Sequence, residues 1–164
     1  MKVITKITNK ILQSNKLKII LTSMIDNIII TKLSIHKSEE GDLLHGLRNT
    51  DYGFQGFEEI YFSKIAENTI KGWKMHTEMT LNLIVPIGRV RFNFIESDDK
   101  LKQINKRLEI DVHIDNYVRI TVPPRIIFAF KGIGSGVNMI TNVANLIHRD
   151  DETQNIPLER FEFK

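Results

Sequence analysis

The chain of 164 residues (19.0 kDa) has the length of one domain with a sizeable core. It contains no cysteine, which excludes disulfides, thiolate metal sites and cysteine nucleophiles and favours a cytoplasmic location. No apolar run reaches the roughly 20 residues that a membrane-spanning helix needs, so we expect no membrane span.

The positive charge is concentrated at the N-terminus. Residues 1–23 hold five lysines and no acidic residue, and a total net charge of +3 therefore leaves −2 for residues 24–164. A weakly acidic body does not fit a nucleic-acid-binding surface, so we expect no nucleic-acid partner. We interpret residues 1–23 as a basic extension, disordered or helical, with a membrane- or partner-binding arm as the alternative. Residues 24–164 are expected to form a single domain.

Short strand-like segments separated by turns fill the chain after residue 24. Strands are expected at residues 28–34, 58–63, 69–76, 79–85, 89–95, 108–114, 117–122, 126–130 and 138–145. Turn residues follow at 86–88, 97–100, 115–116 and 132–136, and no long helix is required. This spacing predicts an all-β sandwich or barrel.

Residues 70–88 hold the strongest candidate site. Lys74 and His76 lie two positions apart on an expected strand, so both side chains should point to one face. Further along, Thr80 and Asn82 alternate with apolar residues. We therefore expect this polar face to line a cavity inside the barrel and the apolar face to meet a second packing layer. Asn82 would then bind substrate or a neighbour within the barrel.

Several short motifs occur in an order that resembles a known family. They are GDLLH (41–45), EIYFS (59–63), IKGWKMH (70–76), Gly88, VPP (122–124) and HRDDE (148–152). The set resembles the cupin-type dTDP-4-dehydrorhamnose 3,5-epimerases and their relatives, over residues 28–163. The resemblance implies a cupin double-stranded β-helix (jelly roll), a homodimer, no cofactor, and a nucleotide-linked 4-keto-6-deoxy sugar as substrate, with dTDP as the expected nucleotide.

The resemblance also implies proton abstraction beside the ketone and reprotonation from the other face. The catalytic histidine of the epimerases falls at Lys74 in this chain, their tyrosine falls near residues 141–142, where there is none, and a further histidine falls at Phe128. We interpret Lys74 as a base whose pKa is lowered by burial or as a cation that stabilises the enolate.

The sugar 3,4-ketoisomerases are similar cupins that use a His-x-His pair on this strand with a nearby tyrosine. His76 matches the second histidine of that pair, which predicts His76 as the acid–base residue. Tyr61 is predicted as a proton relay. The alternatives are a hydrogen-bonded histidine in a cavity wall and a tyrosine that only packs.

The remaining candidates are residues that would bind substrate. Lys71, Trp73, Asn82 and Arg125 are predicted to contact it, with Lys71 and Arg125 at the diphosphate. A metal-binding cupin needs three histidines and a carboxylate, of which only His76 is present, so no metal site is expected.

These residues predict a metal-independent isomerase or epimerase of deoxysugar and polysaccharide biosynthesis. The alternative is an inactive cupin that binds a sugar nucleotide or a protein partner.

Overall fold

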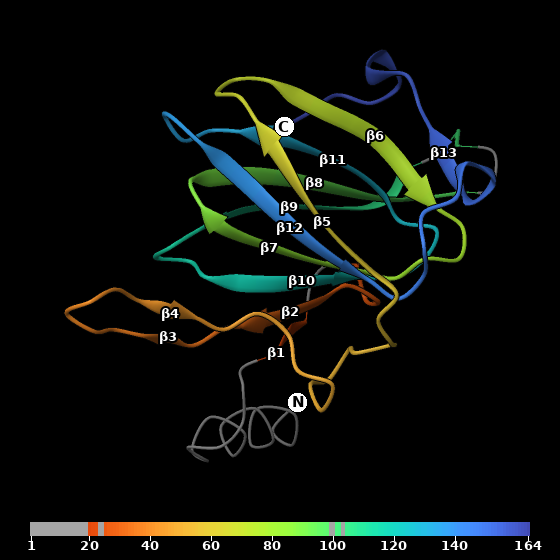
Figure 1. Ribbon diagram of the computed structural model, residues 1–164. Helices are drawn as coiled ribbons and strands as arrows, with labels where there is room; N and C mark the ends of the chain where they lie inside the picture. The colour runs from red at the N-terminus through yellow and green to blue at the C-terminus, as the bar shows by residue number, and fades with distance from the viewer. Residues whose placement is uncertain (1–19, 23–24, 99–100, 103) are drawn as a thin grey trace, which may run out of the picture.

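The computed structural model describes residues 20–22, 25–98, 101–102 and 104–164. Two antiparallel sheets pack face to face (Figure 1). The larger sheet has the order β1 (Ile20–Thr22), β2 (Ile29–Lys32), β10 (Val118–Val122), β7 (Leu81–Ile87), β12 (Asn138–Ala144), β5 (Glu59–Ile65). The smaller sheet has the order β13 (Thr153–Asn155), β6 (Ile70–His76), β11 (Ile127–Gly132), β8 (Arg89–Ser97), β9 (Ile104–His113). The predicted all-β jelly roll is confirmed.

Every strand expected from the sequence has a counterpart near the predicted position, and four further strands were not anticipated. β3 (Ile35–His36) and β4 (Leu43–Leu44) form a hairpin that projects from the body (Figure 1). β13 pairs with β6, and β1 pairs with β2. Of the expected N-terminal extension, residues 1–19 and 23 lie outside the described residues. The helical elements of the described chain are two short 3₁₀ turns, η1 (Asp150–Glu152) and η2 (Leu158–Arg160).

The main core lies between the two sheets. As expected from its alternating sequence, β8 contributes Val90, Phe92 and Phe94, each fully buried, and the rings of Phe92 and Phe94 stack at 5.9 Å. From the opposite sheet, β7 contributes Leu81, Leu83 and Val85 to the same core, among other residues. Burial of such side chains supplies the main driving force for the two sheets to pack.

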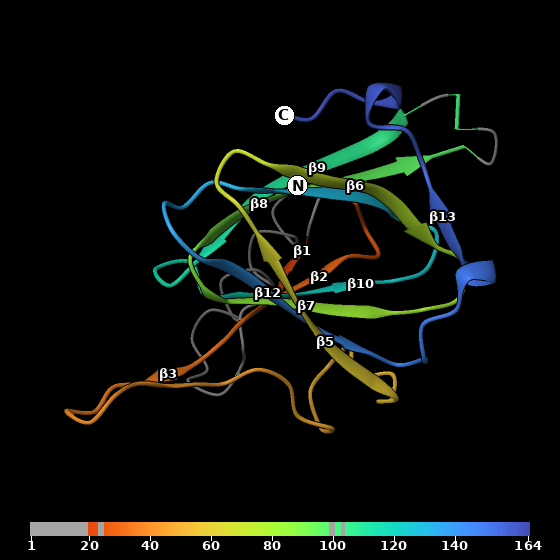
Figure 2. The same cartoon turned by 45° about the horizontal axis from the view of Figure 1, so that its top comes forward.

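A second apolar cluster covers the outer face of the smaller sheet, where the C-terminal segment crosses it (Figure 2). Trp73 is its centre, since the indole is fully buried and packs on Phe161 and Phe163 at ring distances of 5.8 and 6.0 Å. The indole Nε1 donates to the carbonyl oxygens of Leu158 and Phe161. This anchoring fixes β6, the strand that carries the candidate site.

The outer face of the larger sheet is covered by the loop after β4. Arg119 on β10 is completely buried there, and its guanidinium donates to Asp51 at 2.8 Å and to the carbonyl oxygens of Gly46 and Tyr52. Hydrogen bonds to a charged group contribute about 1.5–3 kcal/mol each, so Arg119 holds this loop on the sheet. Both faces of the larger sheet are therefore buried near its centre.

Candidate functional site

A cavity of about 200 Å³ opens between the two sheets. Its polar lining residues are Tyr61, Ser63, Lys71, Lys74, His76, Asn142 and His148. Its apolar lining includes Leu81 and Leu83 from the larger sheet and Phe128 from the smaller one. A site that is mostly apolar, with a few convergent polar groups, has the character of a small-molecule binding site.

A β-bulge on β6 determines which side chains reach this cavity. Phe128 of β11 pairs with Lys74, whereas the next residue, Ala129, pairs with Gly72, so Trp73 is an extra residue in the strand. Gly72 has a φ of +118°, and a Cβ atom there would lie 2.8 Å from the Cα of Ala129. The bulge therefore requires glycine at this position.

Because of the bulge, Lys71, Lys74 and His76 all line the cavity. Strict alternation would have placed Lys71 and Lys74 on opposite faces, since they are three positions apart. The two lysines are solvent-exposed at the cavity wall, whereas His76 is buried. The predicted sharing of one face by Lys74 and His76 is confirmed, and two cations lie at the entrance to the site.

His76 forms a buried pair with a carboxylate. Its Nδ1 lies 2.5 Å from Oε1 of Glu152, and the side chains are 6% and 1% exposed. The imidazole ring also stacks on Phe128, with 6.1 Å between ring centroids. With Nδ1 engaged by the carboxylate, Nε2 is the nitrogen that can meet a substrate. A histidine held in one tautomer by a carboxylate is the arrangement used in acid–base catalysis.

Glu152 is held as a charged acceptor. Burial by itself raises the pKa of this carboxyl, but the hydrogen bond from His76 and the charge of His76 lower it, as do the backbone N–H groups of Glu78 and Met79. The net result is a pKa below the usual value. Glu152 is therefore ionised at neutral pH, where it can stabilise a proton on His76.

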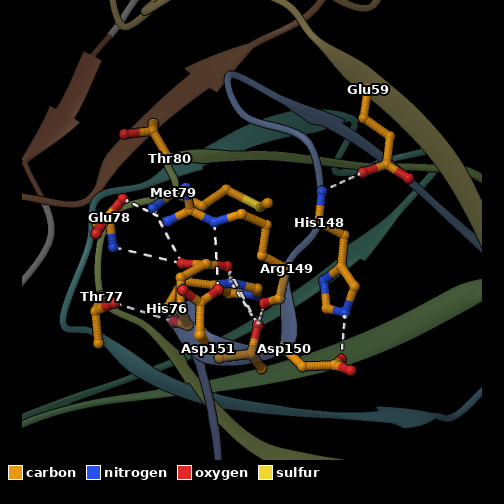
Figure 3. A network of polar contacts seen from close by, with 12 residues as sticks. Glu59, His76, Thr77, Glu78, Met79, Thr80, His148, Arg149, Asp150 and Asp151 are labelled. Atoms are coloured by element: carbon orange, nitrogen blue, oxygen red, sulfur yellow. Dashed lines mark hydrogen bonds and ion pairs between the residues drawn. The ribbon is translucent and has the colours of Figure 1, made fainter.

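The residues that precede Glu152, 148–151, are held by a network of polar contacts (Figure 3). The backbone N–H of His148 donates to Glu59 at 2.7 Å, and Arg149 forms an ion pair with Glu78 at 2.9 Å. The His148 ring lies 3.5 Å from Asp150 and contributes to the cavity lining. These contacts join the segment to β5 and to the connection between β6 and β7, and they fix the position of Glu152 beside β6.

Tyr61 and Asn142 face His76 from the other sheet. They are direct cross-strand neighbours on β5 and β12, and Nδ2 of Asn142 donates to the Tyr61 hydroxyl at 2.6 Å. Burial raises the pKa of Tyr61, so the phenol is protonated at neutral pH and can donate. The structure thus brings Tyr61, Lys71, Lys74 and His76 around one cavity.

Asn82 lies outside this cavity, contrary to our expectation of a polar cavity face on β7. The apolar side chains Leu81 and Leu83 line the cavity, and Asn82 points to the opposite face of the sheet. There it accepts a hydrogen bond from Thr121 at 2.8 Å and donates to the carbonyl oxygen of Val143. The expected face assignment was wrong because loop 46–52 and Arg119 bury the outer face as well.

Trp73 and Arg125 are also placed away from the cavity. Trp73 belongs to the apolar cluster beneath the C-terminal segment. Arg125 is exposed at the turn before β11, where its backbone N–H donates to the carbonyl oxygen of His76 at 2.7 Å. Its side chain lines a separate surface depression with Met75 and Gln154, among others. In the described structure, these two residues support β6 from outside the site.

Neither the scan of protein-family models nor the search of curated proteins found a match. Solved structures do match. A dTDP sugar isomerase from Desulfovibrio desulfuricans G20 is similar with a TM-score of 0.81 and 25% identity, over 88% of this chain and 94% of that one. The fold is that of the dTDP-sugar isomerases and epimerases.

Two further solved structures share this fold. The Legionella pneumophila dTDP-6-deoxy-D-glucose-3,5-epimerase, in complex with dTDP-4-keto-L-rhamnose, has a TM-score of 0.74 at 14% identity, over 85% of this chain and 78% of that one. A 3,4-ketoisomerase mutant from Thermoanaerobacterium thermosaccharolyticum, in complex with TDP-4-keto-6-deoxyglucose, has a TM-score of 0.66 at 15% identity, over 80% and 88%. The resemblance noted from sequence motifs is confirmed at the level of fold.

Within this isomerase-like fold, two residues of the site were not identified from the sequence. Glu152 was included only as the last residue of the HRDDE motif, with no role of its own, and Asn142 only as a position where the tyrosine of the epimerases is missing. The only sequence signal for Glu152 was the HRDDE motif, which supplies carboxylates. A carboxylate that orients a catalytic histidine, as Glu152 orients His76, is a common arrangement.

Among the described residues, no group of three or more His, Cys, Asp or Glu side chains could hold a metal ion. No helix of the described chain is long and apolar enough to cross a membrane.

Proposed function

We propose that the protein is an isomerase or epimerase that acts on a dTDP-linked 4-keto-6-deoxy sugar without a metal ion. The observation that carries this proposal is the buried His76–Glu152 pair at the wall of a cavity. The similarity to a dTDP sugar isomerase along nearly the whole chain supports the substrate class, as do the two relatives solved with dTDP- or TDP-linked keto sugars.

The proposed reaction begins with His76 as the base. Its Nε2 takes the proton from the carbon next to the ketone, the C–H bond breaks, and its electron pair forms an enolate. Glu152 stabilises the imidazolium that results. In an epimerase, a proton then returns to the same carbon on its other face, which inverts that centre. In a ketoisomerase, the proton of the neighbouring hydroxyl passes to the former ketone oxygen, and the former ketone carbon is protonated, which moves the ketone to the neighbouring carbon.

Lys74 and Tyr61 have complementary roles in this proposal. Lys74 lines the cavity on the same strand as His76, so its ammonium can stabilise the negative charge that develops on the enolate oxygen. Tyr61 lies on the opposite sheet with its phenol protonated, so it can donate a hydrogen bond to the ketone oxygen of the bound sugar and relay a proton during the reaction. Lys71, at the cavity wall, is proposed to contact the diphosphate.

An inactive sugar-nucleotide binder is supported less well than an enzyme. A binding protein has no need for a buried carboxylate that holds a cavity histidine in one tautomer, because burying that charge is costly. The base missing at Lys74 and the tyrosine missing near residue 142 both have counterparts nearby. His76 supplies an imidazole two residues later, and Tyr61 supplies a phenol from the next strand.

Incubation with dTDP-4-keto-6-deoxyglucose in D₂O, followed by NMR of the sugar protons, tests the proposal. We expect the C3 proton signal, the C5 proton signal or both to disappear as solvent deuterium is incorporated. A rearranged keto sugar would identify ketone transfer. An unchanged spectrum together with broadened ligand lines would establish binding without catalysis and refute the enzyme.

Replacing Tyr61 with phenylalanine should slow turnover and leave binding largely intact. The phenol relays a proton during the reaction, and general acid catalysis contributes about 10²- to 10⁴-fold to a rate. We expect kcat to fall within this range and KM to rise by no more than about tenfold, the effect of one lost hydrogen bond, as measured by steady-state NMR assays. If Tyr61→Phe turns over like the wild type, Tyr61 only packs, and the second proton donor lies elsewhere.

We also propose a cytoplasmic homodimer, as in the sequence-based expectation. The edge strand β5 supports a dimer, since Ile60 and Phe62 lie two positions apart on it and are 46% and 63% exposed, and a second subunit would bury them. Light scattering should give twice the chain mass of 19.0 kDa. A mass equal to one chain at micromolar concentration would contradict the dimer.

A further inference from the structure

Asn142 contains a buried polar atom that no described residue satisfies. The side chain is 3% exposed and lines the cavity, and its Nδ2 is committed to the Tyr61 hydroxyl. Its Oδ1 has no hydrogen-bond partner in the described structure. Because a buried acceptor without a partner destabilises a fold, such an atom at a cavity calls for an explanation in function.

Thr31 and Arg119 of the same sheet also have a buried polar atom without a partner among the described residues, but of these three residues only Asn142 lines the cavity. Asn82, which is equally buried on the opposite face, makes hydrogen bonds through both its oxygen and its nitrogen. Asn138, at the other end of β12, also uses both atoms. Both of those amides are satisfied within the fold, whereas the oxygen of the Asn142 amide is bonded by no described residue.

Together, Asn142 and Tyr61 present a defined pattern of polar atoms to the cavity. The Tyr61 oxygen accepts from Asn142, which leaves the phenol proton available for an acceptor. The Oδ1 atom of Asn142 requires a donor. A ketone oxygen is an acceptor only, and a hydroxyl group is a donor. A carbon chain that carries a ketone beside a hydroxyl, an α-hydroxyketone, supplies both partners at adjacent carbons.

We infer that Asn142 selects substrates that carry a free hydroxyl group on the carbon beside the ketone. The hydroxyl donates to Asn142 Oδ1 while the ketone oxygen accepts from Tyr61. This inference rests on the proposed function and deepens it, because it specifies the C3 hydroxyl of a 4-keto sugar as the recognised group. A site built to hydrogen-bond a hydroxyl discriminates strongly against an analogue that lacks it.

The test compares two ligands, dTDP-4-keto-6-deoxyglucose and the same sugar nucleotide lacking the C3 hydroxyl. Dissociation constants measured by calorimetry should favour the hydroxylated sugar by a factor of about 10 to 100 in the wild-type protein. Asn142→Leu, which keeps the branching of the side chain and removes the acceptor, should reduce that ratio to about threefold or less. Its melting temperature should stay close to that of the wild type, because the loss of the unpaired buried acceptor offsets the loss of the hydrogen bond to Tyr61.

Thr141→Val is the matched control, since Thr141 is the preceding residue of β12 and does not line the cavity. Its ligand ratio should equal that of the wild type. If Asn142→Leu keeps the full ratio, or if the wild type binds both sugars equally, the inference is overturned while the proposed function stands. If the wild type binds neither sugar nucleotide, the proposed function fails and the inference fails with it.

Discussion

His76→Asn should lower kcat by about 10²- to 10⁴-fold and abolish deuterium incorporation into the sugar on the timescale of the wild-type reaction. The imidazole is the group proposed to remove the proton beside the ketone, and asparagine has no basic nitrogen to replace it. Asparagine still offers a donor to Glu152, so the fold should persist. Binding of the sugar nucleotide should change only a few-fold, because the proposed diphosphate contact lies at Lys71.

A second histidine provides the control for this substitution. His113 ends β9 and contacts Arg89 outside the cavity, so His113→Asn should leave turnover unchanged. Deuterium incorporation that survives in His76→Asn and is lost in Lys74→Ala would contradict the assignment. It would make Lys74 the base, at the position where the resemblance places the epimerase histidine.

The strands could be predicted from the sequence because most of them carry a clear period of two. β8 is the plainest case, since Val90, Phe92 and Phe94 face the core and Arg89 and Arg91 face away. The prediction that the polar face of β7 lines the cavity was wrong because Leu81–Val85 is buried on both faces. Alternating side chains show which residues share a face of such a strand, but they do not show which face meets the cavity between the sheets.

The site was only partly predictable because it depends on contacts that are distant in sequence. Lys74 and His76 could be placed together, since they are two residues apart on one strand. The bulge at Gly72 brings Lys71 to the same face, but the only sign of this bulge in the sequence is the glycine itself. Glu152 lies 76 residues from His76, and nothing local distinguishes it from its acidic neighbours Asp150 and Asp151.

Glu152→Gln should lower kcat by about 10²- to 10⁴-fold, even though Glu152 itself does not line the cavity. The amide cannot stabilise an imidazolium by charge. It also has one acceptor oxygen, where the carboxylate serves both His76 and the backbone N–H groups of Glu78 and Met79. Either His76 or the two backbone N–H groups therefore lose their acceptor, so we expect a lower free energy of unfolding, by about 1–3 kcal/mol. Asp151→Asn, at a neighbouring exposed carboxylate, is the control and should change neither quantity.

The stability cost of Glu152→Gln should also depend on pH. The pKa of Glu152 is lower in the folded protein than its usual value of 4.5, so its ionised form stabilises the fold. This contribution is fully present above the unfolded-state pKa and is lost as the pH falls through the folded-state pKa. Urea unfolding should therefore show a larger difference between wild type and variant at pH 7 than at pH values below 4.5. A difference that is the same across this range would mean that the charge of Glu152 does not stabilise the pair, and that His76 is held by packing alone.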